Sequence, residues 1–345
     1  MTHDRLRLRA LPALAAAVLL LVAPGCAKHD AAGAPALRLA MVTDAARTGN
    51  ASLNDSAFAG LTAAKSLLDA DTTLVESRSA SDYQPNLVML ADEDFDLIYA
   101  VGSPMSHDVD HVARSFPKRR FALIDGVAEE PNVSSVVFRE QEGAFLAGAL
   151  AALVSKTHVV GFLGGKDVPL LHRFEAGYIA GARQIDRHVT VLVRYAGSFD
   201  EVAAGKAAAG ALFDRHADVV LIAAGKTGLG AIDATRARAG AYAIAVGSDQ
   251  DALAKGKILT SVLERVDVAV YRLAEDAVSE KLPSGVEELG LREGAIALTP
   301  FPYSRSVVHP AVIAKLTALR AAVVAGTIVP PGTREQLARF KPVAL

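Results

Sequence analysis

From Leu37 onward, short continuous runs of apolar residues alternate with segments in which apolar residues recur every three or four positions. The first pair is typical: LRLAMVTD (37–44) is apolar up to Asp44, and SAFAGLTAAKSLLDA (56–70) has helical spacing. A continuous apolar run predicts a strand buried on both faces, and the recurring pattern predicts a helix. The alternation therefore predicts an α/β fold whose parallel strands are covered by helices.

The same alternation continues to the end of the chain. Strands are expected at 72–79, 95–103, 119–126, 133–140, 158–165, 189–198, 217–225, 241–250, 256–265 and 294–300, and helices at 84–94, 106–117, 142–156, 169–185, 200–216, 228–240, 266–282 and 309–326. The pattern restarts near residue 157, which predicts two Rossmann-like lobes. We expect an N-terminal lobe over 37–156, to which part of 266–345 returns, and a C-terminal lobe over 157–265.

The N-terminal segment has the layout of a secretory signal, in which three arginines precede an apolar run at residues 11–23. That run is too short for a comfortable membrane span. Cys26 follows, and VAPGC resembles the lipobox at which bacteria attach lipid to cysteine, with Ala23 where leucine is usual. We expect a lipoprotein signal peptide (1–26), a flexible tether (27–36) and a lipid-anchored protein on the periplasmic or extracellular face of the cell envelope. Cleavage without lipid and an uncleaved anchor are the alternatives.

The composition indicates a globular protein and argues against a nucleic-acid partner. The 345 residues are 51% hydrophobic and 21% charged, with a formal net charge of −2. A nucleic-acid binder needs a basic face that displaces counterions, and the longest basic run is KRR at 118–120. The chain is long enough for two domains, and its single cysteine cannot form an internal disulfide.

Carboxylates and glycines lie at the carboxyl ends of the expected strands, where ligands bind in open α/β sheets. The residues at these positions are Asp44, Gly102, Asp125, Gly164, Gly165, Gly225 and Asp249. Asp44 and Asp125 could act in acid–base chemistry, accept hydrogen bonds from a ligand, or cap the element that follows. The polar loop after Asp44 is expected over the same crevice, so two half-sites would face each other across a cleft.

Motifs for covalent chemistry, metals and cofactors are missing or incomplete. AAGKTGLG (223–230) resembles the end of a phosphate-binding loop, but Val220 stands where that motif needs glycine. Its glycines instead favour close approach of the backbone to a ligand. His107 and His111 have a metal-ligand spacing but no third ligand nearby, which favours a solvated helix face. No G-x-S-x-G or H-E-x-x-H motif occurs, but an enzyme stays open because catalytic residues need not form local motifs. We expect no metal and no cofactor.

Several segments, in order, carry a family resemblance. They are MVTD, LNDSAFAGL, VSSVVFREQEGAFLAGALAALVSKTHVVGFLGG, PLLHRFEAGYIAGAR, YAGSF, GKAAAGALFDRHADVVLIAAGKTGLG, VGSDQ and ILTSVLERVDVAVY. From about Leu37 to Pro300 the chain is similar to the basic membrane protein family of bacterial lipoproteins, the purine-nucleoside receptors of ABC-type uptake systems. The resemblance implies a type I periplasmic binding protein fold with two lobes, a hinge and a ligand trapped between them.

The resemblance also implies roles for individual residues. Asp44 and Asp125 would hold the purine edge. Where the family usually reads N-D-K-S-F-N, this chain has Gly49, Asn50, Ala51, Ser52, Leu53 and Asn54. Leu53 therefore replaces the phenylalanine that stacks on the base, and Asn50 replaces the acidic residue.

Two further departures lie where the family holds the ribose. The first aspartate of its G-V-D-S-D-Q motif is Gly247 here, so only Asp249 remains, and Glu264 replaces its ribose-binding lysine. Stacking contributes about 1–3 kcal/mol and a charged hydrogen bond about 1.5–3. Losing these contacts removes on the order of 4–8 kcal/mol, against about 8 for a micromolar complex. Either other residues compensate or the ligand differs, and Glu264 favours a ligand with NH or cationic groups. Possible substitute rings are Phe58, Tyr83, Phe138, Phe174 and Phe199.

Together these observations predict a monomeric, non-enzymatic solute-binding lipoprotein that passes a nucleoside-like ligand to an ABC permease in the inner membrane. The predicted ligand-binding residues are Asp44, Asn50, Leu53, Asn54, Gly102, Asp125, Gly225, Lys226, Asp249 and Glu264, and Cys26 is the predicted lipidation site. Two alternatives stay open. One is a nucleoside hydrolase with Asp44 or Asp125 as base, and the other is a degenerate binding fold with a sensing or structural role in the envelope.

Overall fold

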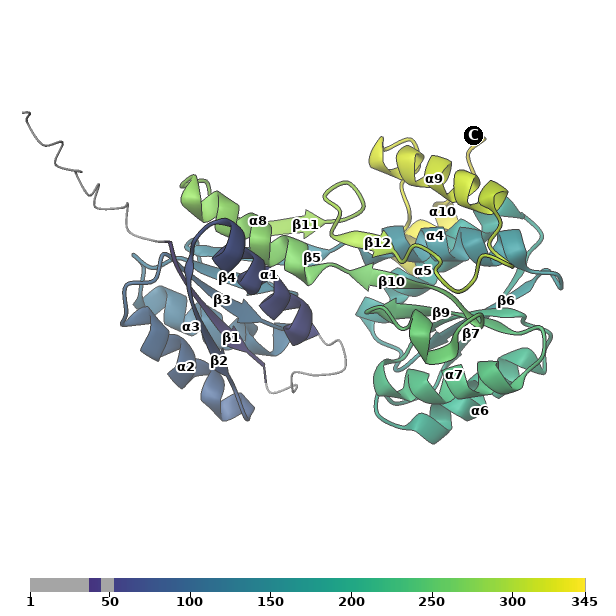
Figure 1. Ribbon diagram of the computed structural model, residues 1–345, viewed down its shortest axis with the longest axis horizontal. Helices are drawn as coiled ribbons and strands as arrows, with labels where there is room; N and C mark the ends of the chain where they lie inside the picture. The colour runs from purple at the N-terminus through teal and green to yellow at the C-terminus, as the bar shows by residue number, and fades with distance from the viewer. Residues whose placement is uncertain (1–36, 45–52, 345) are drawn as a thin grey trace, which may run out of the picture. The chain divides into compact units, whose positions relative to one another are not determined.

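The computed structural model describes residues 37–44 and 53–344, which contain two six-stranded sheets (Figure 1). The first sheet has the order β11-β5-β4-β3-β1-β2, and all its strands are parallel. Its strands are β1 (Arg38–Thr43), β2 (Asp71–Glu76), β3 (Leu97–Val101), β4 (Phe121–Ile124), β5 (Val133–Phe138) and β11 (Gly285–Leu289). The order reverses between β1 and β3, and ligands of such sheets bind at this switch point.

The second sheet repeats the arrangement in the order β12-β10-β9-β8-β6-β7, with β12 antiparallel at its edge. Its strands are β6 (Val159–Gly164), β7 (Thr190–Tyr195), β8 (Val219–Ala223), β9 (Tyr242–Gly247), β10 (Ile258–Glu264) and β12 (Ile296–Leu298). Its switch point lies between β6 and β8. The two sheets therefore present equivalent edges for a ligand.

Helices cover both faces of each sheet, as continuously apolar parallel strands require. They are α1 (Leu53–Leu67), α2 (Tyr83–Ala91), α3 (Ser106–Ser115), α4 (Glu140–Val154), α5 (Pro169–Ile185), α6 (Val202–Phe213), α7 (Gly228–Ala237), α8 (Val266–Val278), α9 (Pro310–Val324) and α10 (Arg334–Arg339). Side chains of a strand alternate between faces. In β1, Leu39 and Met41 share a core with α1 and α8, whereas Ala40 and Val42 share one with α2 and α3. None of the helices within 53–344 has the length and hydropathy needed to cross a bilayer.

Every strand and helix expected within the described residues is present, with ends shifted by a few positions. Two elements were missed. Strand β11 is a short edge strand, and its Val286 is exposed, so no alternating or continuous apolar run marks it. Helix α10 has only six residues, but Thr333 accepts a hydrogen bond from the Gln336 amide (3.1 Å). This Thr-x-x-Gln spacing is a capping signal that could have revealed the helix.

Glycines bring α4 unusually close to α5. Gly148 lies against the Tyr178 carbonyl, and Gly181 lies against the Phe145 carbonyl. At the sheet, Gly143 lies against Val262 of β10. Helix α4 therefore packs with the second sheet, although the sequence assigned its residues to the N-terminal lobe. An all-apolar helix does not reveal in the sequence which sheet it covers, and the lobe boundaries stay a prediction.

Helix α8 returns to the first sheet. Gly60 of α1 lies against the Asp267 carbonyl and Val270 of α8, and the Tyr99 hydroxyl of β3 donates to the Val270 carbonyl (2.9 Å). The chain thus passes between the two sheets after β5, after β10 and after β11.

Side chains link two of these connecting segments. Arg139 NH2 pairs with Glu293 (2.9 Å), and Glu142 accepts from the Leu291 amide (2.7 Å). These charge-assisted bonds tie the start of α4 to the β11–β12 connection.

We expect Gly181→Ala to lower the free energy of unfolding by about 2 kcal/mol or more, because its Cβ would overlap the Phe145 carbonyl oxygen. Gly210→Ala in α6 is the matched control, since nothing lies within 4 Å of a Cβ there. It should be neutral or stabilise by about 0.5–1 kcal/mol, because alanine favours the helix. Urea unfolding of both variants checks this, and equal effects would contradict the close helix contact.

Candidate functional site

The switch point of the first sheet brings three predicted residues together. Thr43 of β1 lies opposite Val101 of β3, so the residues that follow, Asp44 and Gly102, are neighbours. Asn54, at the start of α1, donates to Asp44 Oδ1 from Nδ2 (2.9 Å). Gly102 has φ +109°, and a Cβ there would lie 3.1 Å from Asp44 Oδ2. Glycine thus leaves room for this carboxylate at the sheet edge.

Asp125 extends the same edge by one strand. Its backbone is left-handed (φ 58°), a conformation that aspartate tolerates better than most residues, and its amide donates to the Val136 carbonyl (2.8 Å). Burial raises the pKa of Asp125 to about 6; the Arg173 guanidinium opposes this rise and the Asp44 carboxylate adds to it. The two predicted carboxylates therefore act on each other electrostatically at one edge.

Sequence reasoning missed an ion pair beside them, in which the glutamate is buried and the arginine is partly exposed. Glu140, the first residue of α4, is 3% exposed, and Arg173 of α5 donates to its Oε2 (3.3 Å) and to the Phe138 carbonyl (3.1 Å). Burial raises the pKa of Glu140 to about 7, Arg173 opposes the rise, and Asp125 adds to it. A glutamate in a first helical turn and an arginine within a helix are ordinary surface patterns, so neither was distinctive in the sequence.

Glu264 ends β10 and joins this acidic group from the second sheet. Burial, with a contribution from the carboxylates of Glu140 and Asp125, raises the pKa of Glu264 to about 8. The neighbouring Arg265 is engaged elsewhere, since its NH2 and Nε donate to the two oxygens of Asp267 (2.7 and 2.9 Å). Glu264 therefore lies near the carboxyl groups of Glu140 and Asp125 and has no basic partner beside it in Arg265.

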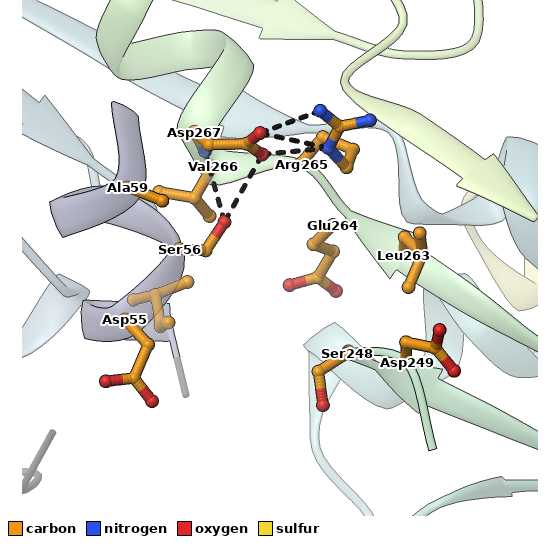
Figure 2. A pocket seen from close by; sticks show the side chains of 12 residues that line it. Asp55, Ser56, Ala59, Ser248, Asp249, Leu263, Glu264, Arg265, Val266 and Asp267 are labelled. Carbon is orange, nitrogen blue, oxygen red and sulfur yellow. Dashed lines mark hydrogen bonds and ion pairs between the residues drawn. The ribbon is translucent and has the colours of Figure 1, made fainter. Parts of the chain in front are cut away.

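Glu264 lines a cavity of about 370 Å³. Its lining residues are Leu53, Asp55, Ser56, Ala59, Gly247, Ser248, Asp249, Leu263, Glu264, Arg265, Val266 and Asp267. They come from α1, from the carboxyl ends of β9 and β10, and from the start of α8. Leu263 lies opposite Gly247 in register, so Glu264 adjoins Ser248, and Figure 2 shows the Glu264 carboxylate directed into the space between α1 and Ser248.

The α1 wall of this cavity is tied to α8. The Asp267 amide donates to Ser56 Oγ (3.1 Å), and Ser56 Oγ lies 3.4 Å from Asp267 Oδ1 (Figure 2). Arg265 is paired with Asp267, and the lining contains three further acidic residues, Asp55, Asp249 and Glu264.

The other predicted residues lie apart from this cavity or outside the described residues. Gly225 follows β8 with φ +55°, close to the Phe199 carbonyl, and Lys226 is exposed. Neither lines the cavity. Asn50 and Cys26 fall outside the described residues.

Of the five candidate rings, three belong to the core: Tyr83, Phe138 and Phe174 are at most 5% exposed. Phe58 on α1 is 46% exposed, and Phe199 is partly exposed. Neither of these two rings lines the cavity of Figure 2.

The histidine pair on α3 has a surface environment. His107 and His111 are exposed, and His111 Nδ1 lies 3.2 Å from Gln84 Nε2. Within 37–44 and 53–344, no three His, Cys, Asp or Glu side chains group in a way that could hold a metal ion.

Comparison with known proteins gives these features a family context. The chain is 33% identical over 319 residues to the ABC transporter nucleoside-binding protein BmpA of Lactococcus lactis, covering 85% of this chain and 91% of that protein. It is 34% identical over 258 residues to basic membrane protein A2 of Borrelia garinii, covering 73% and 76%.

A solved structure supports the fold. The ABC transporter solute-binding protein of Aeropyrum pernix superposes with a TM-score of 0.70 at 26% identity, covering 88% of this chain and 96% of that one. This confirms the predicted type I periplasmic binding protein fold. The model of the family described as PnrA-like ABC transporter substrate-binding proteins matches residues 37–330, and the chain therefore belongs to that family.

Proposed function

We propose that this protein is a lipid-anchored solute-binding protein that captures a nucleoside-like molecule between its two lobes and delivers it to an ABC permease. The observation that carries the proposal is the cavity of Figure 2, whose lining comes from α1 of the first sheet and from the strand ends β9 and β10 of the second. Its volume of about 370 Å³ suits a small molecule. A relative named as nucleoside-binding supports the ligand class.

The strand-end residues supply complementary contacts in this proposal. Asp44 and Asp125 accept hydrogen bonds from the ligand's base, and Asn54 holds Asp44 in place (2.9 Å). Gly102 lets the ligand approach the backbone, and Asp249 reaches the ligand from the second sheet. Gly225 and Lys226 join the site only if their loop closes over it, and Asn50 stays a predicted contact.

The chemistry at Glu264 sets the kind of ligand. Leu53 offers an apolar surface without an aromatic ring, and Gly247 offers no carboxylate. Glu264 faces the cavity among other acids, with Arg265 already paired to Asp267. A ligand bearing an amine or several NH groups at this end would give Glu264 a partner and relieve the like-charge repulsion. We infer an amino-substituted nucleoside or a related cationic compound.

The proposed role involves no covalent chemistry. Asp125, with a pKa raised to about 6, could serve as a base in nucleoside hydrolysis, which is the rival function. Membership of a substrate-binding family supports capture without turnover. Incubation with adenosine separates the two, because release of adenine would contradict a purely binding role.

A ligand series tests the proposed function. Adenosine and 5′-amino-5′-deoxyadenosine should both bind at pH 7, the amine at least about ten-fold tighter, because it adds a charge-assisted bond to Glu264. Glu264→Gln should remove this preference, and Glu264→Lys should reverse it. Isothermal titration calorimetry measures each constant.

Two controls sharpen this series. Glu129→Gln, an exposed site distant in sequence, should leave the preference intact. Affinity for the amine should rise as pH rises from 7 to 8, because Glu264, with a pKa of about 8, becomes more ionised. Loss of affinity over that range would show a protonated Glu264 acting as donor and would contradict the proposed amine contact.

No thermal shift with any nucleoside, base, sugar or amino acid would support a degenerate binding fold.

The ligand-free protein should lose stability as pH rises from about 4.5 to 8. Glu264 has a folded pKa of about 8, above its ordinary 4.5, so the folded state retains a proton that the unfolded state releases. Glu140 and Asp125, with pKa values raised to about 7 and 6, act with the same sign.

Glu264→Gln should therefore stabilise the protein at pH 8 by about 1–3 kcal/mol and have little effect near pH 4.5. Urea unfolding at the two pH values checks this, with Glu129→Gln as the exposed control. An equal effect at both pH values would show that Glu264 titrates normally.

Replacing Cys26 tests the anchor. Cys26→Ala should abolish incorporation of an alkyne-labelled fatty acid in bacteria and release the protein from the membrane fraction. A wild-type protein that takes up no label would indicate cleavage without lipid. Label retained by Cys26→Ala would place the lipid elsewhere.

A further inference from the structure

A buried carboxylate lies behind the second-sheet wall of the cavity. Asp251, at the start of the 3₁₀ turn Asp251–Ala254 that follows β9, is 1% exposed. Its Oδ1 accepts from Ser261 Oγ (2.7 Å), and its Oδ2 accepts from Thr299 Oγ1 (2.6 Å). No ion pair of the described residues involves Asp251, so two neutral hydroxyls hold this carboxylate.

These hydroxyls are themselves fixed by the sheet. Thr299, just after β12, accepts from the Ser261 amide through Oγ1 (2.9 Å), and its Oγ1 lies 2.8 Å from Thr260 Oγ1. Ser261 of β10 also accepts from the Gln250 amide (3.0 Å). Thr260, Ser261 and Thr299 are at most 2% exposed, so water does not compete for these bonds.

The hydrogen bonds of Asp251 continue to the lining of the cavity. The Asp251 amide donates to Asp249 Oδ1 (3.0 Å), and Asp249 and Ser248 line the cavity. The segment begins at Gly247, whose φ is +100° and around which nothing lies within 4 Å of a Cβ position. Pairing of Gly247 with Leu263 of β10 holds the start of this segment, and the hydrogen bonds through Asp251 hold its other end.

We propose that Asp251 is a positioning residue, which together with Ser261 and Thr299 holds the 247–251 segment so that Ser248 and Asp249 face the ligand before it binds. The proposal rests on the proposed function only in taking the cavity of Figure 2 as the ligand site.

The buried Asp251 carboxylate costs stability, but its hydrogen bonds fix the orientation of the turn. Burial raises the pKa of Asp251, and the Asp249 carboxylate adds to the rise, so this carboxylate costs stability at neutral pH. An apolar side chain would fill a core position without that cost, but packing is non-directional, whereas two hydrogen bonds to fixed hydroxyls set the orientation of the turn. Preorganisation of this kind strengthens ligand binding by reducing the ordering that binding requires.

Thr299→Val is the sharpest test, because valine matches threonine in shape and removes only the hydroxyl. We expect about a ten-fold weaker affinity for 5′-amino-5′-deoxyadenosine and about ten-fold faster hydrogen exchange at the Gln250 and Asp251 amides of the ligand-free protein. Thr299→Ser, which keeps the hydroxyl, should restore both values to near wild type. Ser261→Ala should act like Thr299→Val, and the double variant should add little to either.

Thr235→Val is the matched control. Thr235 is equally buried, and its Oγ1 donates to the Ala231 carbonyl within α7 (2.8 Å), so it tests loss of a buried hydroxyl elsewhere. It should leave affinity and the two exchange rates unchanged. The proposal would be overturned if Thr299→Val and Ser261→Ala both left the exchange rates unchanged. It would also be overturned if both left the affinity within two-fold of wild type. Failure of the wild-type protein to bind the nucleoside would refute the proposed function instead, while the exchange rates would still test the positioning of the segment.

Discussion

Parallel strand pairing is the constraint on which the rest of this structure depends. Because parallel strands run the same way, their carboxyl ends share one edge of the sheet, and the register decides which residues meet there. Thr43 opposite Val101 makes Asp44 and Gly102 neighbours, and Leu263 opposite Gly247 makes Glu264 adjoin Ser248. Residues far apart in the chain thus become parts of the same two edges.

Those edges gather several buried carboxyl groups. Burial, together with a neighbouring carboxylate in each case, raises the pKa values of Asp125, Glu140 and Glu264 to about 6, 7 and 8. Arg173 contacts Glu140, and Arg265 is engaged by Asp267. A site with this electrostatic imbalance is costly to fold and suited to a ligand that brings donors or positive charge. In the proposed function, Glu264 is central to that preference.

Close packing and buried polar bonds support the edges from behind. Glycine contacts join α4 to α5 and α1 to α8, which leaves little freedom in how these helices cover their sheets. Behind the cavity, Asp251 links the segment after β9 to Ser261 and Thr299. Rigid sheets with hydrogen-bonded loops at their rims are a suitable frame for a protein that closes on a ligand.

The sequence by itself determined the order of strands and helices, the α/β class, and the strand-end positions of Asp44, Asp125 and Asp249, because apolar periodicity and loop position are local properties. The family followed from the resemblance of several short segments to known sequences. It did not reveal β11, the packing of α4 on the second sheet, or the entry of Glu140 and Arg173 into the site. Only the tertiary structure decided these features, because an edge strand has little pattern of its own, and because pKa values and partners depend on contacts between residues distant along the chain.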